Sequence, residues 1–515
     1  MSNFKPGYLK RVTNKVFPKG RRVQFFLCVS ALLALVQVLL SSFLVVQIGS
    51  YAHQRFLFVI LSGLLILFCF IAFSARSPTY LSSLLKALLP SVVTISAFLM
   101  LSFPFGEQPY SLVEAGMYGS FFLVTFISGV LLASTFCLIG YIHFFVVAMA
   151  VRCISYGLTT INVYLFALFD GVTSLSSFIP WGFVNIRYWG HIATWFLPLI
   201  PLAAFVGPWR NNRLWHLLVA LGAGLWWWIV FLSASRGSAL GVAFGVILVS
   251  LLLGRRAFPW LKVFLIYLGV GVILWLLLSV AVPSLIADEV QLRTLKSDSS
   301  GRWPLWVEAW RMSLQNFPFG MGPQSWLTHE PITEAFVDSK QFGHPHNMYL
   351  MWAAEYGWFV IAALGVLVVQ AIRNFWRCRA ELFEAEDSGQ ILLLAGFTAS
   401  VSAALFHAGV SAVFMAPASM LVGMFVLIGF WGLVQPKSSV TGIQPPSTIN
   451  SGFRVITTAL LATVIVIAWA FWAGEVWRYY KDMRADETYY HEHVREGTLP
   501  RFWRHGNFPR DVNPE

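Results

Sequence analysis

The chain has 515 residues, of which 57% are hydrophobic and only 11% are charged. A soluble globular domain has about a quarter charged residues, so this composition excludes a soluble enzyme or binding domain. The net charge of +12 is explained by membrane orientation and lipid headgroups, and no nucleic-acid partner is expected. We predict an all-α polytopic membrane protein with about 12–13 transmembrane helices, each satisfying its own backbone hydrogen bonds.

The amino-terminal residues 1–23 are strongly basic, which predicts that they lie in the cytoplasm. Nine apolar segments follow within residues 24–283 and are predicted to cross the membrane. The first of them, Phe25–Val46, is too long for the core of a signal peptide and is expected to be retained. The nine predicted spans are 25–46, 56–73, 82–103, 112–137, 141–168, 192–208, 214–233, 237–253 and 260–283.

Basic residues between the predicted spans agree with this orientation. If the spans alternate from a cytoplasmic amino terminus, four separate basic loops fall on the cytoplasmic side, as the positive-inside rule requires. These loops contain Arg76; Arg210 and Arg213; Arg255 and Arg256; and Arg373, Arg377 and Arg379.

Residues 284–345 form a long segment between two spans, predicted to lie on the periplasmic side. Such a long connection is usually functional or disordered, and its tryptophans favour order. Trp303, Trp306 and Trp310 recur at helical spacing, which predicts an amphipathic helix starting near Arg302 and suited to the membrane interface.

Four further spans are predicted within residues 346–474, at 346–371, 390–411, 414–434 and 454–474. Residues 435–450 are rich in proline, serine and threonine and are predicted to be a flexible linker before the last span. Residues 475–515 form a tail that the alternation places in the periplasm. The five cysteines lie in spans or on the cytoplasmic side, so no disulfide is expected.

Polar residues gather at four places that the predicted topology brings to the periplasmic side. Ionisable groups near or inside spans are costly and are therefore functional candidates. The candidate site residues are Asn185, Arg187 and His191 before the sixth span, Arg236 before the eighth, Arg302 and Arg311 in the long loop, and His344, His346, Asn347 and Glu355 at the tenth.

Each of these groups also has a simpler explanation. An arginine at a helix end can reach lipid phosphates, and Glu355 can be the structural partner of a buried cation. A histidine pair at an interface is often only a hydrogen-bonded anchor. His344 and His346 are spaced like metal ligands, but a zinc site needs three or four, and only His329 and scattered acids are nearby. No metal or other cofactor is predicted.

The order of these motifs resembles the bacterial O-antigen ligase and polymerase superfamily. The motifs are an arginine before a span, Ser-Arg-Gly at the start of a later span, Gly-Arg-Trp followed by Pro-x-Gly-x-Gly, and His-Asn opening a helix; together they cover about Asn185–Gly357. The ligase pattern continues after His-Asn with nine residues, a glycine, two residues and a glycine. His346, Asn347 and Gly357 fit that pattern, whereas Val360 stands at the second glycine position.

The resemblance implies a membrane-embedded glycosyltransferase of the GT-C type, which transfers a glycan from undecaprenyl diphosphate to a hydroxyl without a metal. Arg187 and Arg236 are suited to hold the diphosphate, because guanidinium groups are permanently charged and bidentate. His346 is suited to accept the proton of the acceptor hydroxyl, with Asn347 orienting it or the sugar. The resemblance places the reaction at the periplasmic face of the inner membrane.

Several functions remain open at this point. The acceptor could be a sugar of the lipid A-core, as in a ligase, another glycan repeat, as in a polymerase, or a pilin-like protein, as in an O-oligosaccharyltransferase. A transporter of lipid-linked glycans would more often show internal repeats and discontinuous helices, and neither is evident in the sequence. A purely structural protein would leave the histidines and arginines unexplained.

Overall fold

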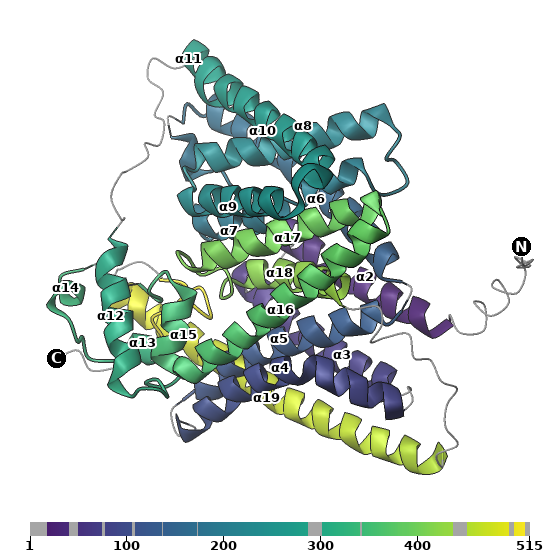
Figure 1. Ribbon diagram of the computed structural model, residues 1–515. Coiled ribbons are helices and arrows are strands. Elements are labelled where there is room, and N and C mark those ends of the chain that lie inside the picture. Colours follow the sequence, from purple (N-terminus) through teal and green to yellow (C-terminus); the bar gives the residue numbers. More distant parts are fainter. Residues whose placement is uncertain are drawn as a thin grey trace, which may run out of the picture.

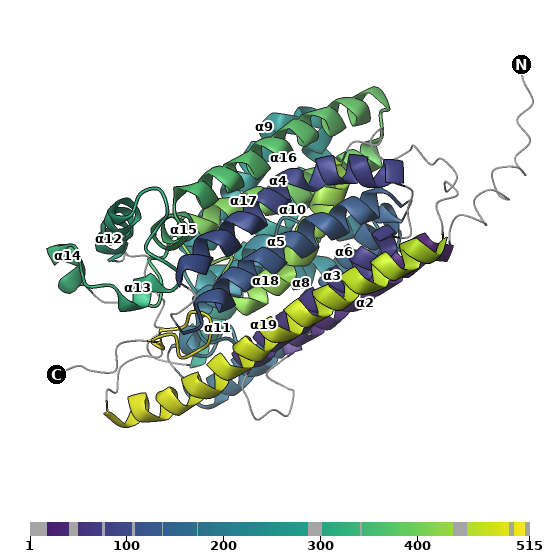
Figure 2. The same cartoon turned by 90° about the horizontal axis from the view of Figure 1, so that it is seen from below.

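The computed structural model describes residues 18–40, 50–74, 78–105, 109–135, 137–172, 174–286, 301–339, 342–435, 451–493 and 499–509. Within these residues the regular structure is helical and contains no strand, which confirms the predicted all-α class. Long helices run side by side as a bundle, and smaller helices gather at one end of it (Figures 1 and 2).

The bundle is built from helices that follow one another along the chain with short connections between most of them. Its long helices are α2 (Pro18–Leu40), α3 (Ser50–Ser74), α4 (Pro78–Ser102), α5 (Ser111–Ala133), α6 (Leu138–Phe169), α8 (Arg213–Leu232), α9 (Arg236–Leu253), α10 (Phe258–Trp275), α16 (Trp358–Glu384), α17 (Ser388–Ala408), α18 (Pro417–Val434) and α19 (Ser451–His493). The short helices are α7 (Ile186–Phe196), α11 (Val282–Ile286), α12 (Arg302–Gln315), α13 (Ser325–Thr328), α14 (Glu334–Val337) and α15 (Met348–Tyr356).

Eleven stretches of the described residues are long and apolar enough to cross a membrane. One of these stretches, Arg236–Leu285, contains both α9 and α10, and α7 is too short to be among them. These two facts account for the difference from the larger number expected from the sequence. The predicted linker, residues 435–450, lies outside the described residues apart from Gln435, as do residues 1–17 of the basic amino terminus.

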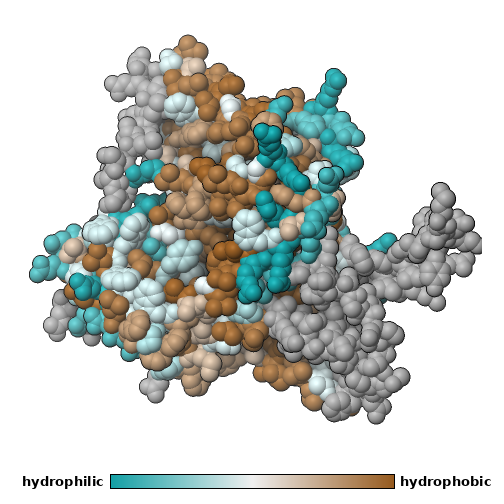
Figure 3. All heavy atoms as spheres, viewed as in Figure 1, coloured by the Kyte–Doolittle hydropathy of each residue, from teal (hydrophilic) through white to brown (hydrophobic). Residues whose placement is uncertain are grey.

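Hydrophobic residues cover the middle of the face seen in Figure 3, and hydrophilic residues gather towards its two ends. One end carries basic loops: Arg256 donates to the carbonyl of Phe383 at 3.0 Å, and Arg379 donates to the carbonyl of Leu252 at 2.8 Å. The predicted loops at Arg255–Arg256 and Arg373–Arg379 therefore share one end of the bundle. Such a distribution is expected of a protein whose middle lies in a lipid bilayer.

Two of the predicted spans are interrupted. The sixth, 192–208, is not one helix: α7 ends at Phe196, and a 3₁₀ turn follows at Ile200–Ala204, where Pro198 and Pro201 cannot continue an α-helix. The tenth, 346–371, breaks into α15 and α16 at Gly357, whose φ of 83° is unfavourable for other residues.

The break at Gly357 is held by the turn that follows α12. Trp358 N–H donates to the carbonyl of Pro318 at 2.8 Å, and Gly322 N–H donates to the carbonyl of Glu355 at 2.9 Å. A Cβ on Gly357 would lie 2.2 Å from the Pro318 oxygen, which is far inside van der Waals contact. Glycine is therefore required here by both its dihedral angle and its surroundings.

Residues 301–339 form a small ordered cap over this end of the bundle. We call them the cap. Its core is hydrophobic and contains Leu305, Ala309, Met312, Trp326 and Phe336. The sequence correctly predicts a helix that starts near Arg302. The N-cap residue of this helix is Gly301, which has no side chain to make a capping hydrogen bond.

The tryptophans of α12 lie mainly on its outer face. Trp303 is 65% exposed and Trp310 is 45% exposed, which fits the amphipathic helix expected from the sequence. The opposite face carries a buried acid, Glu308, which accepts hydrogen bonds from His329, from the backbone N–H groups of Ile332 and Thr333, and from the Thr333 hydroxyl. These bonds hold the rest of the cap on α12.

The carboxy-terminal part of the chain differs from the expected simple tail. Helix α19 continues to His493, well beyond the predicted end at residue 474, and runs along the outside of the bundle, where it packs on α3 and α5 (Figure 2). Residues 499–509, which we call the C-terminal segment, pack against the residues that precede α15. The reason for this packing is a buried arginine, described below.

Candidate active site

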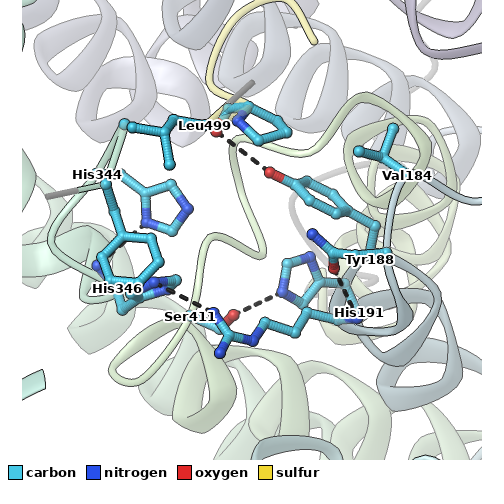
Figure 4. A pocket seen from close by; sticks show the side chains of 12 residues that line it. Val184, Tyr188, His191, His344, His346, Ser411 and Leu499 are labelled. Carbon is cyan, nitrogen blue, oxygen red and sulfur yellow. Dashed lines mark hydrogen bonds between the residues drawn. The ribbon is translucent and has the colours of Figure 1, made fainter. Parts of the chain in front are cut away.

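A pocket of about 210 Å³ opens at the end of the bundle that carries the cap. Figure 4 shows His344 and His346 on one side of it, Val184, Tyr188 and His191 on the other, and Leu499 at its rim. Four segments far apart in the sequence thus build one cavity. Its lining residues are Val184, Asn185, Arg187, Tyr188, His191, Phe342, Gly343, His344, His346, Ser411, Leu499 and Pro500.

The pocket brings Arg187 and His346 together. The Nη1 of Arg187 lies 3.4 Å from Nε2 of His346. A guanidinium can only donate, so Nε2 must be the unprotonated ring nitrogen and the proton lies on Nδ1. Within the described residues, Nδ1 of His346 is buried and has no hydrogen-bond partner. The nitrogen available to accept a proton therefore faces the arginine.

Arg302 lies close enough to Arg187 and Arg236 to be affected by their charges. Burial and then the charges of Arg187 and Arg236 lower the pKa of Arg302 to about 10. Each of these arginines occupies the first turn of a helix, namely α7, α9 and α12. The dipole at a helix amino terminus is itself positive, so cations are unfavourable there unless an anion is bound. The arrangement concentrates positive potential at the site.

Two asparagines begin the helices that carry the site. Asn185 caps α7 by accepting a hydrogen bond from the backbone N–H of Arg187 at 2.9 Å. Asn347 caps α15 by accepting from the backbone N–H of Leu350 at 3.1 Å. An asparagine cap is worth about 0.5–2 kcal/mol and sets where a helix starts. Both asparagines therefore position Arg187 and His346, and their contact with substrate stays a prediction.

Glycines bring α9 close to α17 and so place Arg236 at the site. Gly237, Gly241 and Gly245 recur at every fourth position, and added Cβ atoms would lie 2.5 Å from Nε2 of His407, 2.8 Å from the carbonyl of Ala403 and 2.2 Å from the carbonyl of Ala399, respectively. Small residues at this spacing allow close contact between membrane helices. The first turn of α9 consequently lies beside α7 and α17.

A polar chain continues from the pocket between these helices. His191 on α7 lies 2.7 Å from the Ser411 hydroxyl through its Nε2, and the His191 ring lies 5.1 Å from the ring of His407. His407 in turn contacts the hydroxyl of Thr194 through Nδ1 at 2.8 Å. His191 therefore lines the pocket as expected, with a side chain already held by its neighbours.

Both histidines that precede α15 are electrically neutral at pH 7. Burial, followed by the charges of Arg501, Arg187 and Arg302, lowers the pKa of His344 to about 3. Burial also lowers the pKa of His346 well below its ordinary value, with His344, Arg187 and Arg302 contributing further. His344 accepts a hydrogen bond from the backbone N–H of His346 through Nδ1 at 3.1 Å, which helps to hold His346 at its φ of 57°.

Five of the ten candidate residues do not line the pocket, namely Arg236, Arg302, Arg311, Asn347 and Glu355. Arg311 is exposed on α12 and lies nine positions after Arg302, about 13 Å further along the helix axis. Glu355 is fully buried behind α15 and bonds to Arg501 at 2.6 and 2.7 Å. Its role as the partner of a buried cation, one of the two alternatives left open by the sequence, is what the geometry shows.

The sequence did not indicate several residues that build the pocket. Tyr188 donates to the carbonyl of Pro500 at 3.3 Å, and Ser411 holds His191. Arg501 belongs to a segment that was expected to be a tail. Only Glu114 gave a signal that could have been used, since an acid inside the predicted span 112–137 is rare without a function or a partner.

One comparison with known proteins found a match in this part of the chain. Residues 217–365, less than a third of the chain, match the family model described as O-antigen ligase. The match runs from α8 into α16 and includes Arg236, Arg302 and His346, while Arg187 precedes it. No curated protein matches the chain. Over this region the match supports the resemblance inferred from the motifs: residues 217–365 are similar to the O-antigen ligase family.

Proposed function

We propose that this protein transfers a glycan from undecaprenyl diphosphate to an acceptor hydroxyl at the periplasmic face of the bacterial inner membrane, and that the acceptor is the lipid A-core. The family match supports glycan transfer of the O-antigen ligase type in general. The observation that carries the finer proposal is that Arg187 meets His346 in the pocket, while Arg302 lies near enough to Arg187 and Arg236 for their charges to lower its pKa.

The arginines suit a diphosphate leaving group. When the bond between the sugar and the diphosphate breaks, negative charge develops on the departing oxygen, and guanidinium groups stabilise it through paired hydrogen bonds. The helix amino termini of α7, α9 and α12 add to the same potential. We assign Arg187 and Arg236 to the diphosphate, and Arg302 to the same charge from the side of the cap.

His346 suits the acceptor hydroxyl. In the proposed reaction the acceptor oxygen forms a bond to the anomeric carbon, the anomeric carbon loses its bond to the diphosphate, and the hydroxyl proton passes to Nε2 of His346. The electron pair of the broken bond leaves with undecaprenyl diphosphate. Positioned general bases of this kind contribute about 10²–10⁴ in rate.

Donor binding prepares His346 for this step. In the free protein, nearby Arg187 and Arg302 contribute to the lowered pKa of His346. A bound diphosphate brings negative charge that offsets these cations, so the pKa of His346 rises when the donor binds. The histidine therefore becomes a better base once the donor is in place, which limits proton transfer to the occupied site.

The proposed reaction uses no metal. The three guanidinium groups supply the positive charge that a divalent cation supplies in metal-dependent glycosyltransferases. We therefore expect chelators to leave the transfer rate unchanged, and a loss of activity that added divalent ions restore would contradict this part of the proposal.

The acceptor is identified by its product. Purified protein is incubated with a short undecaprenyl-diphosphate glycan and, in separate reactions, with lipid A-core, with no added acceptor and with a pilin-like peptide. Ligation predicts one glycan chain on lipid A-core and none elsewhere. A ladder of longer glycans on the lipid carrier would identify a polymerase instead, and a glycosylated peptide would identify a protein O-oligosaccharyltransferase.

A further inference from the structure

The C-terminal segment forms part of the pocket wall. Leu499 and Pro500 line the cavity, and Tyr188 donates to the Pro500 carbonyl across it (Figure 4). The next residue, Arg501, turns inward and is 0% exposed. The hydroxyl of Tyr51 on α3 donates to the Arg501 carbonyl at 2.6 Å. The segment is therefore fixed in the protein interior at the edge of the site.

Arg501 joins two buried carboxylates from different helices. Its Nε and Nη2 donate to Glu114 on α5 at 2.8 and 3.0 Å, and its Nη2 also contacts Glu355 on α15 at 2.6 and 2.7 Å. Both acids are fully buried. A buried charge that loses its partner costs about 3–5 kcal/mol, so these contacts hold the segment firmly.

A second buried arginine balances the group. Arg55 on α3 is also fully buried; it donates through Nε to the carbonyl of Phe502 at 3.1 Å and through Nη2 to the carbonyl of Met415 at 2.7 Å. The guanidinium of Arg55 lies over the Phe502 ring, 4.5 Å from its centre. Two guanidinium groups, one of them the segment's own, are thus buried together with two carboxyl groups at the C-terminal segment.

The remaining donor of Arg501 reaches the residues before α15. Its Nη1 donates to the carbonyl of Gly343 at 3.3 Å, three positions before His346. Gly343 also packs directly on the segment, because a Cβ at this position would lie 2.6 Å from the Leu499 carbonyl. We call residues 342–347 the histidine loop. Arg501 contacts both the start of this loop and Glu355 on the helix that follows it.

We propose that Arg501 is a positioning residue that sets the place of His346 relative to Arg187, which makes the C-terminal segment a working part of the active site. The proposal rests on the function proposed above, since positioning matters only if His346 acts on a substrate. Arg501 fixes the histidine loop at Gly343 and the helix at Glu355, so both ends of the stretch that carries His346 are held by one side chain.

A purely structural role would affect stability alone. The two roles are separated by the chemical reactivity of His346, which diethyl pyrocarbonate measures because it acylates neutral imidazole nitrogens. In the wild-type protein His346 is only 5% exposed and should react slowly. His407 is also buried, on α17 away from the segment, and reports whether the fold is intact. The exposed His491 gives the reference rate.

Three variants are compared in detergent by this labelling and by glycan transfer. Arg501→Ala removes the guanidinium and leaves space for added methylguanidinium. Gly343→Ala keeps the buried arginines and acids but forces the histidine loop away from Leu499. This variant therefore tests the proposal if Arg501→Ala does not fold. Arg504→Ala is the matched control, because Arg504 is an exposed arginine of the same segment.

For Arg501→Ala and Gly343→Ala we expect acylation of His346 to rise severalfold while that of His407 stays low, and kcat for transfer to fall at least tenfold with little change in the KM for the donor. Methylguanidinium should reverse both effects in Arg501→Ala only. Folded variants with wild-type labelling and wild-type kcat would overturn the proposal. Altered labelling with no transfer even by the wild type would instead refute the proposed function and show only that Arg501 holds His346 in place.

Discussion

At the scale of single residues, the central feature is a neutral histidine held against an arginine. Because the guanidinium of Arg187 can only donate, the contact at 3.4 Å fixes the tautomer of His346 and directs its basic nitrogen to the place where the proposed diphosphate binds. The lowered pKa of His346 keeps this nitrogen unprotonated in the neutral range. Once the donor diphosphate draws Arg187 to itself, a substrate hydroxyl in the pocket would meet a base that is already unprotonated.

The pH dependence of transfer tests this account. The pKa of His346 in the free protein lies well below its ordinary value of 6.5, so kcat/KM for the donor should stay constant from pH 8 to below pH 6.5. Protonation below the lowered pKa removes the base, so the rate then falls. Because the diphosphate raises this pKa, the acidic limb of kcat should lie at higher pH than that of kcat/KM. The account would be contradicted if both acidic limbs lay near pH 6.5, or if the acidic limb of kcat lay at lower pH than that of kcat/KM.

Arg236 should act on donor binding. Arg236→Ala removes a partner from a charge that the donor carries before reaction, so the Kd for the donor should rise by about tenfold or more, as expected for a charge-assisted hydrogen bond of about 1.5–3 kcal/mol. Arg236→Lys should recover only part of the donor affinity, since an ammonium group keeps the charge but loses the bidentate geometry of the guanidinium. Arg311→Ala, which removes an exposed arginine of α12, is the control. Unchanged donor binding in Arg236→Ala would reduce this arginine to an interface anchor.

At the scale of elements, the site depends on helices that begin at the same place. The sequence could indicate Ser-Arg-Gly and His-Asn as helix starts, because serine and asparagine are preferred capping residues. It could not show that α7 is only 11 residues long or that α15 ends at Gly357, since hydropathy does not distinguish a broken crossing from a continuous one. The break at Gly357 is held by backbone contacts with Pro318 and Gly322, which lie far from it in the sequence.

The close packing of α9 on α17 can be tested with paired alanine variants. Gly245→Ala should destabilise the protein by about 1–3 kcal/mol, because its Cβ would lie 2.2 Å from the Ala399 carbonyl and the helices must separate. Gly269→Ala on α10 has nothing within 4 Å of its Cβ and should be neutral or slightly stabilising. Thermal unfolding in detergent measures both. Equal melting temperatures for the two variants would show that the glycines of α9 are not needed for contact.

At the scale of the whole molecule, the sequence was informative about class and less informative about assembly. Composition and apolar runs were enough for the all-α membrane class, and a helix at Arg302 followed from tryptophan spacing. The ion pairs of Arg501 with Glu114 and Glu355 join residues 387 and 146 positions apart, so no local pattern could reveal them. The expected tail was misjudged for that reason: a mixed basic and acidic sequence gives no sign of which arginine is buried.

The orientation of the bundle in the membrane stays a prediction. We expect the cap to face the periplasm and the end with Arg256 and Arg379 to face the cytoplasm. A cysteine introduced at the exposed Glu330 should react with an impermeant thiol reagent in intact spheroplasts, whereas native Cys378 should react only after lysis. Labelling of Cys378 and protection at residue 330 would reverse the orientation.

The most direct test of the central claim is glycan transfer from an undecaprenyl-diphosphate donor by purified wild-type protein and by His346→Ala, with donor binding measured in parallel. The account predicts that His346→Ala binds the donor with nearly unchanged affinity while its transfer rate falls by about 10²–10⁴, as expected when a positioned general base is lost. His344→Ala should lose less, about tenfold, because it removes only the hydrogen bond to the backbone of His346. Near-normal transfer by His346→Ala, with transfer abolished in His344→Ala, would contradict the account.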